Sequence, residues 1–192
     1  MMSIWIKGQE EIMNKFRRLV IGCVLIWSFS LSYALASEER IISQSNEYGG
    51  KTEETTYKKG NSRYDEGIYK IIEFYDANGK IREIESYYTD ERSKKDGVKK
   101  REQYYFQSRT KTLLTKAEFY YTDAYSSYNG MYKCEEKYHE NGNKKVSEFF
   151  YTDKWAKTHV VSKMIIDYDS KGLEKKRTHY DSKGKIISQE ER

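Results

Sequence analysis

The chain has 192 residues, with 35 basic and 30 acidic side chains, no proline and a formal net charge of +5. A net charge this small gives little reason to expect a nucleic-acid partner. With two cysteines in the whole chain, a disulfide-rich fold is excluded, so stability has to come from packing and strand pairing.

The N-terminal residues 1–36 have the pattern of a secretory signal peptide. The basic segment Asn14–Arg18 precedes a largely apolar run, Leu19–Tyr33, and Ala34–Ala36 supplies the small residues that a signal peptidase needs for cleavage after residue 36. The apolar run is short for a membrane-spanning helix, which needs roughly 20 residues. We therefore expect cleavage, and no integral membrane span in the chain that remains.

Met13 is the predicted start of translation. The residues before it include Glu10 and Glu11, which do not suit the basic start of a leader. The stretch Gly8–Ile12 would also be encoded by purine-rich codons resembling a bacterial ribosome-binding site. Residues 1–36 hold four of the 35 basic and two of the 30 acidic side chains, so residues 37–192 carry a net charge of +3. We expect a bacterial protein that is periplasmic or extracellular.

Residues 37–66 form a polar N-terminal segment with few apolar residues. Such a composition is compatible with partial disorder. Two features instead favour a degenerate copy of the repeat described next: Arg40–Gln44 is echoed by Lys185–Gln189, and Tyr48–Lys51 contains two glycines suited to a hairpin turn. Both interpretations stay open at this point.

A repeated sequence fills residues 67–192. The motif Glu148–Asp153 has close copies at Glu118–Asp123 and Glu85–Asp90. Tyrosines in similar surroundings recur at intervals of 30, 33 and 30 residues. We divide this domain into four units, which are 67–96, 97–129, 130–159 and 160–192.

Each unit is predicted to contain a strand, a tight turn, a second strand and a longer loop. The segment Ile68–Tyr75 is rich in aromatic and β-branched residues, which favour strands. Asn78-Gly79, repeated at Asn141-Gly142, predicts a two-residue turn in which both residues take a positive φ. In the second unit Gln107–Thr110 lacks glycine, which predicts a longer loop or a bulge.

We predict an all-β fold: an antiparallel meander of repeated β-hairpins, with about eight to ten strands. The meander forms an extended, twisted sheet that either stays open or curls toward a barrel. Helices are not expected, because no stretch after residue 36 keeps an apolar spacing of three and four residues.

The candidate binding surface consists of tyrosines that recur at equivalent positions of the units. These tyrosines are Tyr75, Tyr105, Tyr138, Tyr168, Tyr88, Tyr121 and Tyr151. Side chains at one repeat position share a face of the sheet, so the rings should form one or two rows. Such rows stabilise a sheet through cross-strand contacts, and exposed rings would also bind glycans or an extended peptide.

Catalytic and metal-binding patterns are not found. His139, His159 and His179 are 20 residues apart, which does not match the repeat and is wider than usual zinc-ligand spacing. Asp90, Asp123 and Asp153 recur once per unit, which favours a structural role at strand exits. We expect no catalytic residue, no metal and no cofactor.

Two further features are interpreted as structural. The basic run Lys94–Arg101 is expected to be a solvated loop, with attraction to an anionic surface as the alternative. Cys134 falls within a predicted strand and suits a small packed side chain better than a reactive thiol.

The segments Phe74–Glu83, Tyr138–Lys145 and Tyr180–Ile186 resemble the core of MORN-variant repeats, the YwqK-like, antitoxin-type repeat proteins of bacteria. They are more weakly similar to the YD repeats of Rhs-type shell proteins. The resemblance covers roughly residues 67–190 and implies an extended antiparallel β-repeat sheet. Its antitoxin function would imply a toxin as partner.

The sequence predicts an exported β-repeat protein that is not an enzyme and acts as a binding or structural module at the cell envelope. Its expected partner is a protein or a cell-surface polysaccharide. One alternative is an immunity-like protein that masks a toxin. Another is a glycan-directed enzyme, which would need two carboxylates facing each other across a cleft.

Overall fold

A computed structural model describes residues 38–107 and 111–192, which form eleven strands in a single sheet and four short helices. The strands are β1 (Glu38–Gln44), β2 (Gly49–Tyr57), β3 (Ile68–Asp76), β4 (Ile81–Tyr88), β5 (Val98–Gln107), β6 (Thr112–Tyr121), β7 (Met131–Tyr138), β8 (Lys144–Tyr151), β9 (Lys163–Tyr168), β10 (Glu174–Tyr180) and β11 (Ile186–Glu191). The helices are α2 (Ser62–Asp65), α3 (Asp90–Asp96), α4 (Asp123–Asn129) and α5 (Asp153–His159). Apart from Glu38 and Glu39, all described residues belong to one compact unit, Arg40–Arg192.

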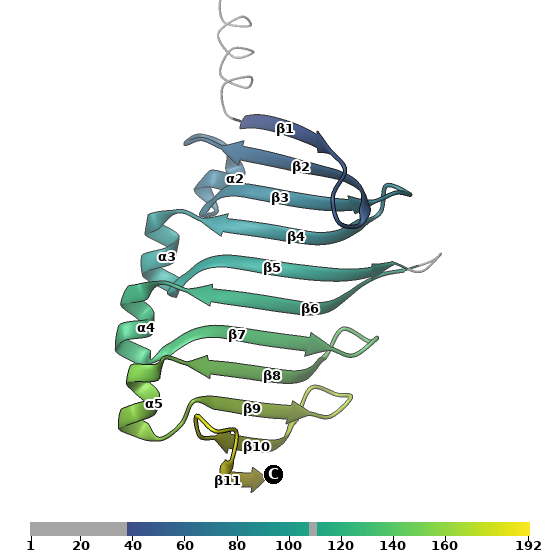
Figure 1. The fold of residues 1–192 in the computed structure, drawn as a ribbon. Helices are drawn as coiled ribbons and strands as arrows, with labels where there is room; N and C mark the ends of the chain where they lie inside the picture. The colour runs from purple at the N-terminus through teal and green to yellow at the C-terminus, as the bar shows by residue number, and fades with distance from the viewer. Residues whose placement is uncertain (1–37, 108–110) are drawn as a thin grey trace, which may run out of the picture. The chain divides into compact units, whose positions relative to one another are not determined.

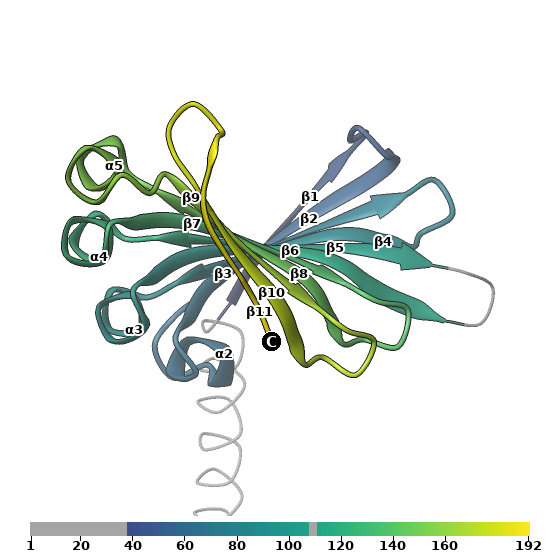
Figure 2. The same cartoon turned by 90° about the horizontal axis from the view of Figure 1, so that it is seen from below.

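The strand order follows the sequence from β1 to β11 without a crossover, and the pairings from β2 to β11 are antiparallel. The all-β meander is therefore confirmed, with one strand more than the upper bound expected. β1 and β11 lie at opposite ends of the sheet, which stays open and does not close into a barrel (Figure 1). Figure 2 shows the strands fanning out across the sheet, as expected for an extended, twisted sheet.

The expectation of long loops without helix is wrong, because α3, α4 and α5 occupy the connections between units. Each helix has seven residues, too few to display an apolar period of 3.6. Their caps explain them instead. A threonine hydroxyl accepts from a backbone N–H in the first turn at Thr89, Thr122 and Thr152. The aspartates that follow these threonines start the helices, where a negative charge is favourable.

The three helices stack along one end of the strands (Figure 1). The stacking is anchored at the glycine that ends the preceding helix. Gly130, at φ +76°, accepts the backbone N–H of Thr152 through its carbonyl, and the Trp155 ring packs so closely that a methyl group there would overlap it. Gly97 holds Thr122 and Tyr125 in the same way. The glycine that ends one helix thus fixes the position of the next helix, by accepting a backbone hydrogen bond and by contacting its aromatic ring.

The hairpin turns at the other end of the strands differ from the two-residue turn predicted. In the turn Asp76–Gly79 the glycine N–H donates to the Asp76 carbonyl, and the Asp76 carboxylate accepts from the N–H groups of Asn78 and Lys80. Gly79 has φ +73°, but Asn78 does not have a positive φ. The aspartate side chain, which the prediction ignored, favours a four-residue turn with only its last residue left-handed. The corresponding loop of the second unit falls in residues 108–110, outside the described ranges.

The described part of the polar N-terminal segment joins the sheet as β1, β2 and α2. Its first turn runs from Asn46 to Gly49 and has the same backbone hydrogen bonds as the turn Asp76–Gly79. The predicted signal peptide lies outside the described residues. Among those that are described, no helix is long and apolar enough to cross a membrane.

The sheet is a single layer, and its core is accordingly thin. Within residues 38–107 and 111–192, the buried hydrophobic residues are Ala117, Cys134 and Ile166, whereas twelve polar or charged residues are buried. Strand β11 is exposed along its whole length. Side-chain contacts across strands, rather than a second packed layer, therefore have to carry most of the stability.

Candidate functional site

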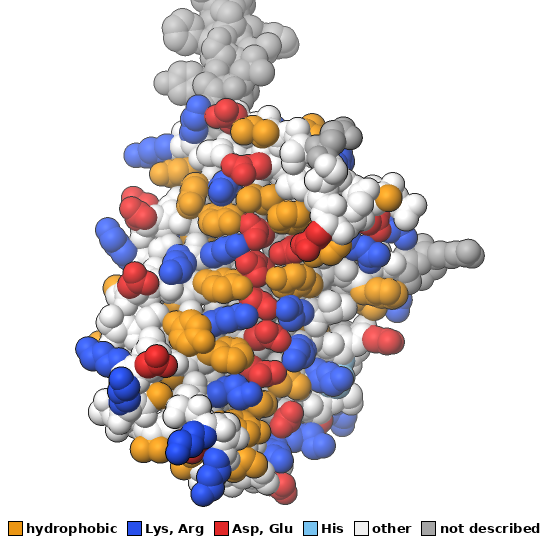
Figure 3. Space-filling view, in the orientation of Figure 1, with side chains coloured by type: hydrophobic (Ala, Val, Ile, Leu, Met, Phe, Trp, Pro, Cys, Tyr) orange, Lys and Arg blue, Asp and Glu red, His pale blue; other side chains and the backbone are white. Residues whose placement is uncertain are grey.

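One face of the sheet carries a continuous ladder of glutamates. Five of them stand directly opposite one another on adjacent strands: Glu85, Glu102, Glu118, Glu135 and Glu148. Figure 3 shows this face, with acidic side chains in a column across the strands and basic and hydrophobic side chains beside them. We call it the ladder face. Like charges placed directly opposite repel, so the ladder needs compensation.

Lysines between the glutamates supply that compensation. Lys100 Nζ lies 2.6 Å from a carboxylate oxygen of both Glu85 and Glu102. Glu118 receives Lys116 and Lys133, each at 2.6 Å. Burial alone would raise the pKa of Glu118, but the hydrogen bonds from these lysines and from a tyrosine outweigh it and lower the pKa to about 2. The ladder is therefore ionised and paired at neutral pH.

A second row on the same face alternates lysine with an aromatic ring on successive strands. Its members are Lys70, Tyr87, Lys100, Tyr120, Lys133, Phe150, Lys163 and Tyr180. The ammonium group of Lys70 lies 4.4 Å from the ring centre of Tyr87, and that of Lys163 lies 5.0 Å from Tyr180. Tyr87, Tyr120 and Phe150 thus each lie between two lysines, whose stems cover apolar surface, and Tyr180 ends the row beside Lys163.

The seven tyrosines of the predicted binding surface lie on the opposite face, which we call the tyrosine face. Each follows a ladder-face residue directly in sequence, and successive residues of a strand point to opposite sides. They form two rows. Tyr75, Tyr105, Tyr138 and Tyr168 lie toward the hairpin turns, and Tyr88, Tyr121 and Tyr151 lie toward the helices.

The rings of the tyrosine face are all half-buried. Tyr138 donates from its hydroxyl to Glu136 at 2.6 Å, and Tyr75 donates to Glu73 at 3.1 Å. Burial and the neighbouring Glu73 raise the pKa of Tyr75 to about 12. Tyr121 stacks on Tyr125 with 4.7 Å between ring centres. These rings are engaged with their own sheet and helices rather than presented to solvent.

Two hollows lie along the border between the ladder face and the helices, and Tyr121 and Tyr88 of the tyrosine face each line one of them. One has a volume of about 700 Å³ and is lined by Lys99, Tyr120, Tyr121, Asp123, Ser126, Ser127, Gly130, Tyr132, Thr152, Lys154, Trp155, Thr158 and His159. The other, of about 410 Å³, is lined by Tyr69, Tyr87, Tyr88, Asp90, Ser93, Lys99, Lys100, Tyr120 and Thr122. Because they share Lys99 and Tyr120, they adjoin, and we call the pair the helix-side trough.

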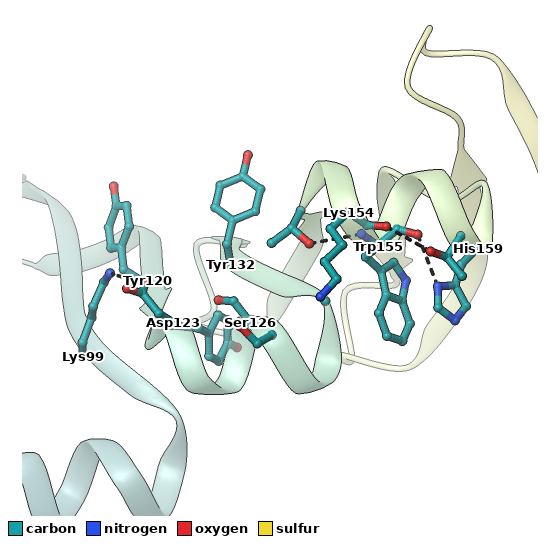
Figure 4. Close-up of a pocket in the computed structure, with 13 residues that line it drawn as sticks. Lys99, Tyr120, Asp123, Ser126, Tyr132, Lys154, Trp155 and His159 are labelled. Carbon is teal, nitrogen blue, oxygen red and sulfur yellow. Dashed lines mark hydrogen bonds and ion pairs between the residues drawn. The ribbon is translucent and has the colours of Figure 1, made fainter.

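β-Bulges supply the exposed rings of the trough. Lys133 pairs with Phe150 and Met131 with Tyr151, so Tyr132 between them has no partner on β8. Tyr69 is left out of the β3–β4 register in the same way. A bulge turns its extra side chain out of the regular alternation, and Tyr132 is accordingly 46% exposed and Tyr69 37% exposed. Figure 4 shows Tyr120 and Tyr132 standing side by side above the helix backbone.

Helix α5 forms the far wall of the larger hollow. The ring of Trp155 stacks on His159 (Figure 4), with 3.7 Å between ring centres. Its ring centre also lies 6.1 Å from that of Tyr151. At the other end of the hollow, Lys99 is 3.7 Å from the carboxylate of Asp123. No ion pair joins Lys154 to a carboxylate of the described chain. The hollow thus combines flat rings, several hydroxyls, one carboxylate and a free ammonium group.

Groups for covalent catalysis do not converge in the trough. Its larger hollow contains one carboxylate, that of Asp123, and its histidine is stacked on Trp155 with Nδ1 3.2 Å from the Trp155 carbonyl. Cys134 is only 3% exposed, and burial raises the pKa of its thiol to about 12.

The three histidines lie on separate elements: His139 in a turn, His159 on α5 and His179 on β10. Among the described residues, the one group of potential metal ligands close to one another is Glu83, Glu85 and Glu102, which contains no histidine. The carboxylates of Glu85 and Glu102 already form ion pairs with Lys100, and that of Glu83 accepts a hydrogen bond from the Tyr48 hydroxyl.

Sequence reasoning found the repeat but missed this trough. Tyr120 belongs to the repeated motif and so could be noticed in the sequence. Tyr132 and Lys99 reach the trough only because each lies in a β-bulge, and the positions of bulges depend on the register of strand pairing. No protein-family model matches the chain, and no curated protein matches it. The resemblance to MORN-variant repeats therefore remains a prediction.

Proposed function

We propose that the protein is an exported, non-catalytic binding module that holds a cell-surface polysaccharide in the helix-side trough. The observation that carries the proposal is the composition of the trough, where aromatic rings, two of them exposed, lie among lysines, hydroxyls and the two carboxylates of Asp90 and Asp123. Sugar rings stack their C–H faces on aromatic rings, and their hydroxyls need both donors and acceptors. The predicted signal peptide supports a ligand at the cell envelope.

A polysaccharide fits the trough better than an extended peptide does. A peptide bound as an added strand uses unpaired backbone groups at a sheet edge. The trough instead crosses the strands from β3 to β7, whose backbone groups are paired with neighbouring strands. Recognition there rests on side chains. Equivalent positions recur every two strands, or about 9–10 Å, which suits a ligand that itself repeats.

Each hollow of the trough contains one carboxylate, Asp123 in the larger and Asp90 in the smaller, and neither hollow is lined by a pair, which supports binding without hydrolysis. Glycoside hydrolysis normally needs two carboxyl groups about 5–10 Å apart across the bond that breaks. Asp123 is highly exposed and next to Lys99, so it is placed to accept hydrogen bonds from hydroxyls. Lys154 favours a ligand that carries carboxylate groups.

The test is a binding titration of the purified chain with a uronic-acid polysaccharide and with the same polymer after reduction of its carboxyl groups. Trp155, in the wall of the hollow, reports binding through its fluorescence. We expect binding of the acidic polymer, a loss of about tenfold in affinity for Tyr132→Ala, and weaker binding of the reduced polymer.

Tyr128→Ala is the matched control, because Tyr128 is 84% exposed on α4 and does not line the trough. It should bind like the unaltered protein. Equal losses in Tyr132→Ala and Tyr128→Ala would contradict the trough as the site. Absence of binding to every polysaccharide in a broad panel would contradict the function itself.

A further inference from the structure

The edge strand β11 is available for pairing. Along the described chain, β11 pairs only with β10, and all six of its residues are exposed. Ile186 is 50% exposed and Ile187 44% exposed, which is unusual for large aliphatic side chains on both sides of one strand. An edge strand without proline presents unpaired backbone groups to any strand that fits.

The charges around β11 are ordered along the strand. Lys183 and Lys185 precede it, Glu190 and Glu191 end it, and the four residues between are uncharged. No ion pair joins these four charged side chains to other described residues. In an antiparallel pairing of β11 with itself, the basic end of each strand lies beside the acidic end of the other. A parallel pairing would instead place like charges together.

We propose that β11 pairs antiparallel with β11 of a second copy of this chain, which makes a twofold symmetric dimer with one continuous sheet. With the axis at Ser188, Lys185 stands opposite Glu191 of the other copy and Ile187 opposite Gln189. Both pairs form twice because the interface is self-complementary. The backbone groups that β10 leaves unpaired then find partners.

The opposite edge does not offer the same complementarity. β1 has its charged residues Glu38, Glu39 and Arg40 at one end and uncharged Ser43 and Gln44 at the other. Antiparallel pairing of β1 with itself would place these charges against neutral residues. Exposed charges on an edge strand often discourage association. On β11, however, the charges at the two ends have opposite signs, so an antiparallel copy is attracted and not repelled.

The symmetry has a consequence for ligand binding. A twofold axis perpendicular to the sheet leaves both ladder faces on the same side, with the two helix columns at opposite ends of the strands. If the trough binds a polysaccharide as proposed above, the dimer binds it through two sites. Two sites on one polymer raise the apparent affinity without any new contact.

The test is the mass of the purified protein in solution, measured by sedimentation equilibrium over a range of concentrations. The unaltered protein should be a dimer. E190K/E191K places lysines at both ends of β11, and K183E/K185E places glutamates at both ends, while the neighbouring Arg192 is paired with Glu174 of β10. Each variant alone should therefore dissociate at least tenfold more readily. Mixed together, the two variants should form a heterodimer, because opposite charges again meet.

The orientation is tested by Ser188→Cys, which stands at the axis. Under oxidation it should give a disulfide-linked dimer, whereas Lys176→Cys on β10 should not. Circular dichroism checks that each variant keeps its β structure. A monomer at all concentrations would overturn the proposal, and so would a dimer whose stability ignores the charge variants. Failure of the polysaccharide test leaves this measurement unaffected, because it contains no ligand.

Discussion

The two faces of this sheet are made from the same strands but stabilised differently. On the ladder face, ionised glutamates and lysines alternate with aromatic rings, and the charges are paired across neighbouring strands. On the tyrosine face, half-buried rings surround small residues such as Ala117, which is 0% exposed, and Cys134. The ladder face thus depends mainly on charge pairing, whereas the tyrosine face combines aromatic cover with fewer ion pairs, such as that of Lys144 with Glu136.

The difference decides where a ligand can bind. Rings on the tyrosine face are already engaged with neighbouring strands, helices and carboxylates. On the ladder face, the regular alternation is interrupted by bulges at the helix end, and there the rings of Tyr69 and Tyr132 become exposed. Different side chains should therefore stabilise the two faces, and substitutions on each face should show it.

The largest expected effect is that of breaking the ladder. Glu118→Gln removes the negative charge that pairs with Lys116 and Lys133. Of the two lysines, Lys133 then keeps an ion pair with Glu135, at 3.8 Å. Because Glu118 is 5% exposed while the lysines are partly exposed, we expect a loss of about 2–3 kcal/mol in the free energy of unfolding, measured in urea.

Glu140→Gln, an exposed residue in a hairpin turn, is the control for that measurement. Its free energy of unfolding should change by less than about 0.5 kcal/mol. A Glu118→Gln protein as stable as the control would mean that the ladder contributes nothing to stability, and the contrast between the faces would disappear.

Acid should weaken the ladder face selectively. The pKa of Glu118 is lowered to about 2, so its contribution is complete above its ordinary value near 4.5 and is lost as pH falls toward 2. The pKa of Glu102 is lowered too, by hydrogen bonds that outweigh burial, whereas burial raises that of Glu83, which opposes the trend. We expect a net loss of about 1–2 kcal/mol between pH 5 and pH 2.5.

Urea unfolding at several pH values measures this loss. The Glu118→Gln variant should show a clearly smaller dependence on pH over the same interval, because the group that titrates has been removed. If the variant and the unaltered protein lose stability in parallel, Glu118 is not the group responsible.

The sequence was sufficient to predict the meander, because the strand-forming residues and the turn residues of a hairpin are adjacent in the sequence. It also placed repeated tyrosines in rows. The ladder was only half visible: Glu85, Glu118 and Glu148 open the repeated motif, but Glu102 and Glu135 join them through the register of pairing. Register depends on contacts between strands and cannot be read from spacing alone.

The helices and the trough escaped prediction for a related reason. A seven-residue helix is defined by its caps, and Asp90, Asp123 and Asp153 were interpreted as structural residues at strand exits, not as the first residues of helices. The trough then depends on where those helices stack and on bulges such as that at Tyr132. Both are products of packing between units.

Removing one tyrosine hydroxyl from each face compares them directly. The Tyr120 hydroxyl donates to Glu118 at 2.6 Å and lies 3.0 Å from Glu102, whereas that of Tyr138 donates to Glu136 alone. We expect Tyr120→Phe to lower the free energy of unfolding by about 1 kcal/mol and Tyr138→Phe by about half as much. Denaturant unfolding of the two variants side by side measures the ratio, and a larger effect at Tyr138 would reverse the proposed contrast.

The smallest effect is expected on removal of the Tyr151 hydroxyl. The Tyr151 ring covers the tyrosine face beside Trp155. Its ring centre lies 6.1 Å from that of Trp155, and no hydrogen bond joins its hydroxyl to another described residue. If the tyrosine face is stabilised by rings rather than by hydroxyls, Tyr151→Phe should change the free energy of unfolding by less than about 0.5 kcal/mol, while Tyr151→Ala should lower it by about 2–3 kcal/mol. A substantial loss on removal of the hydroxyl alone would show that this face, too, depends on polar pairing.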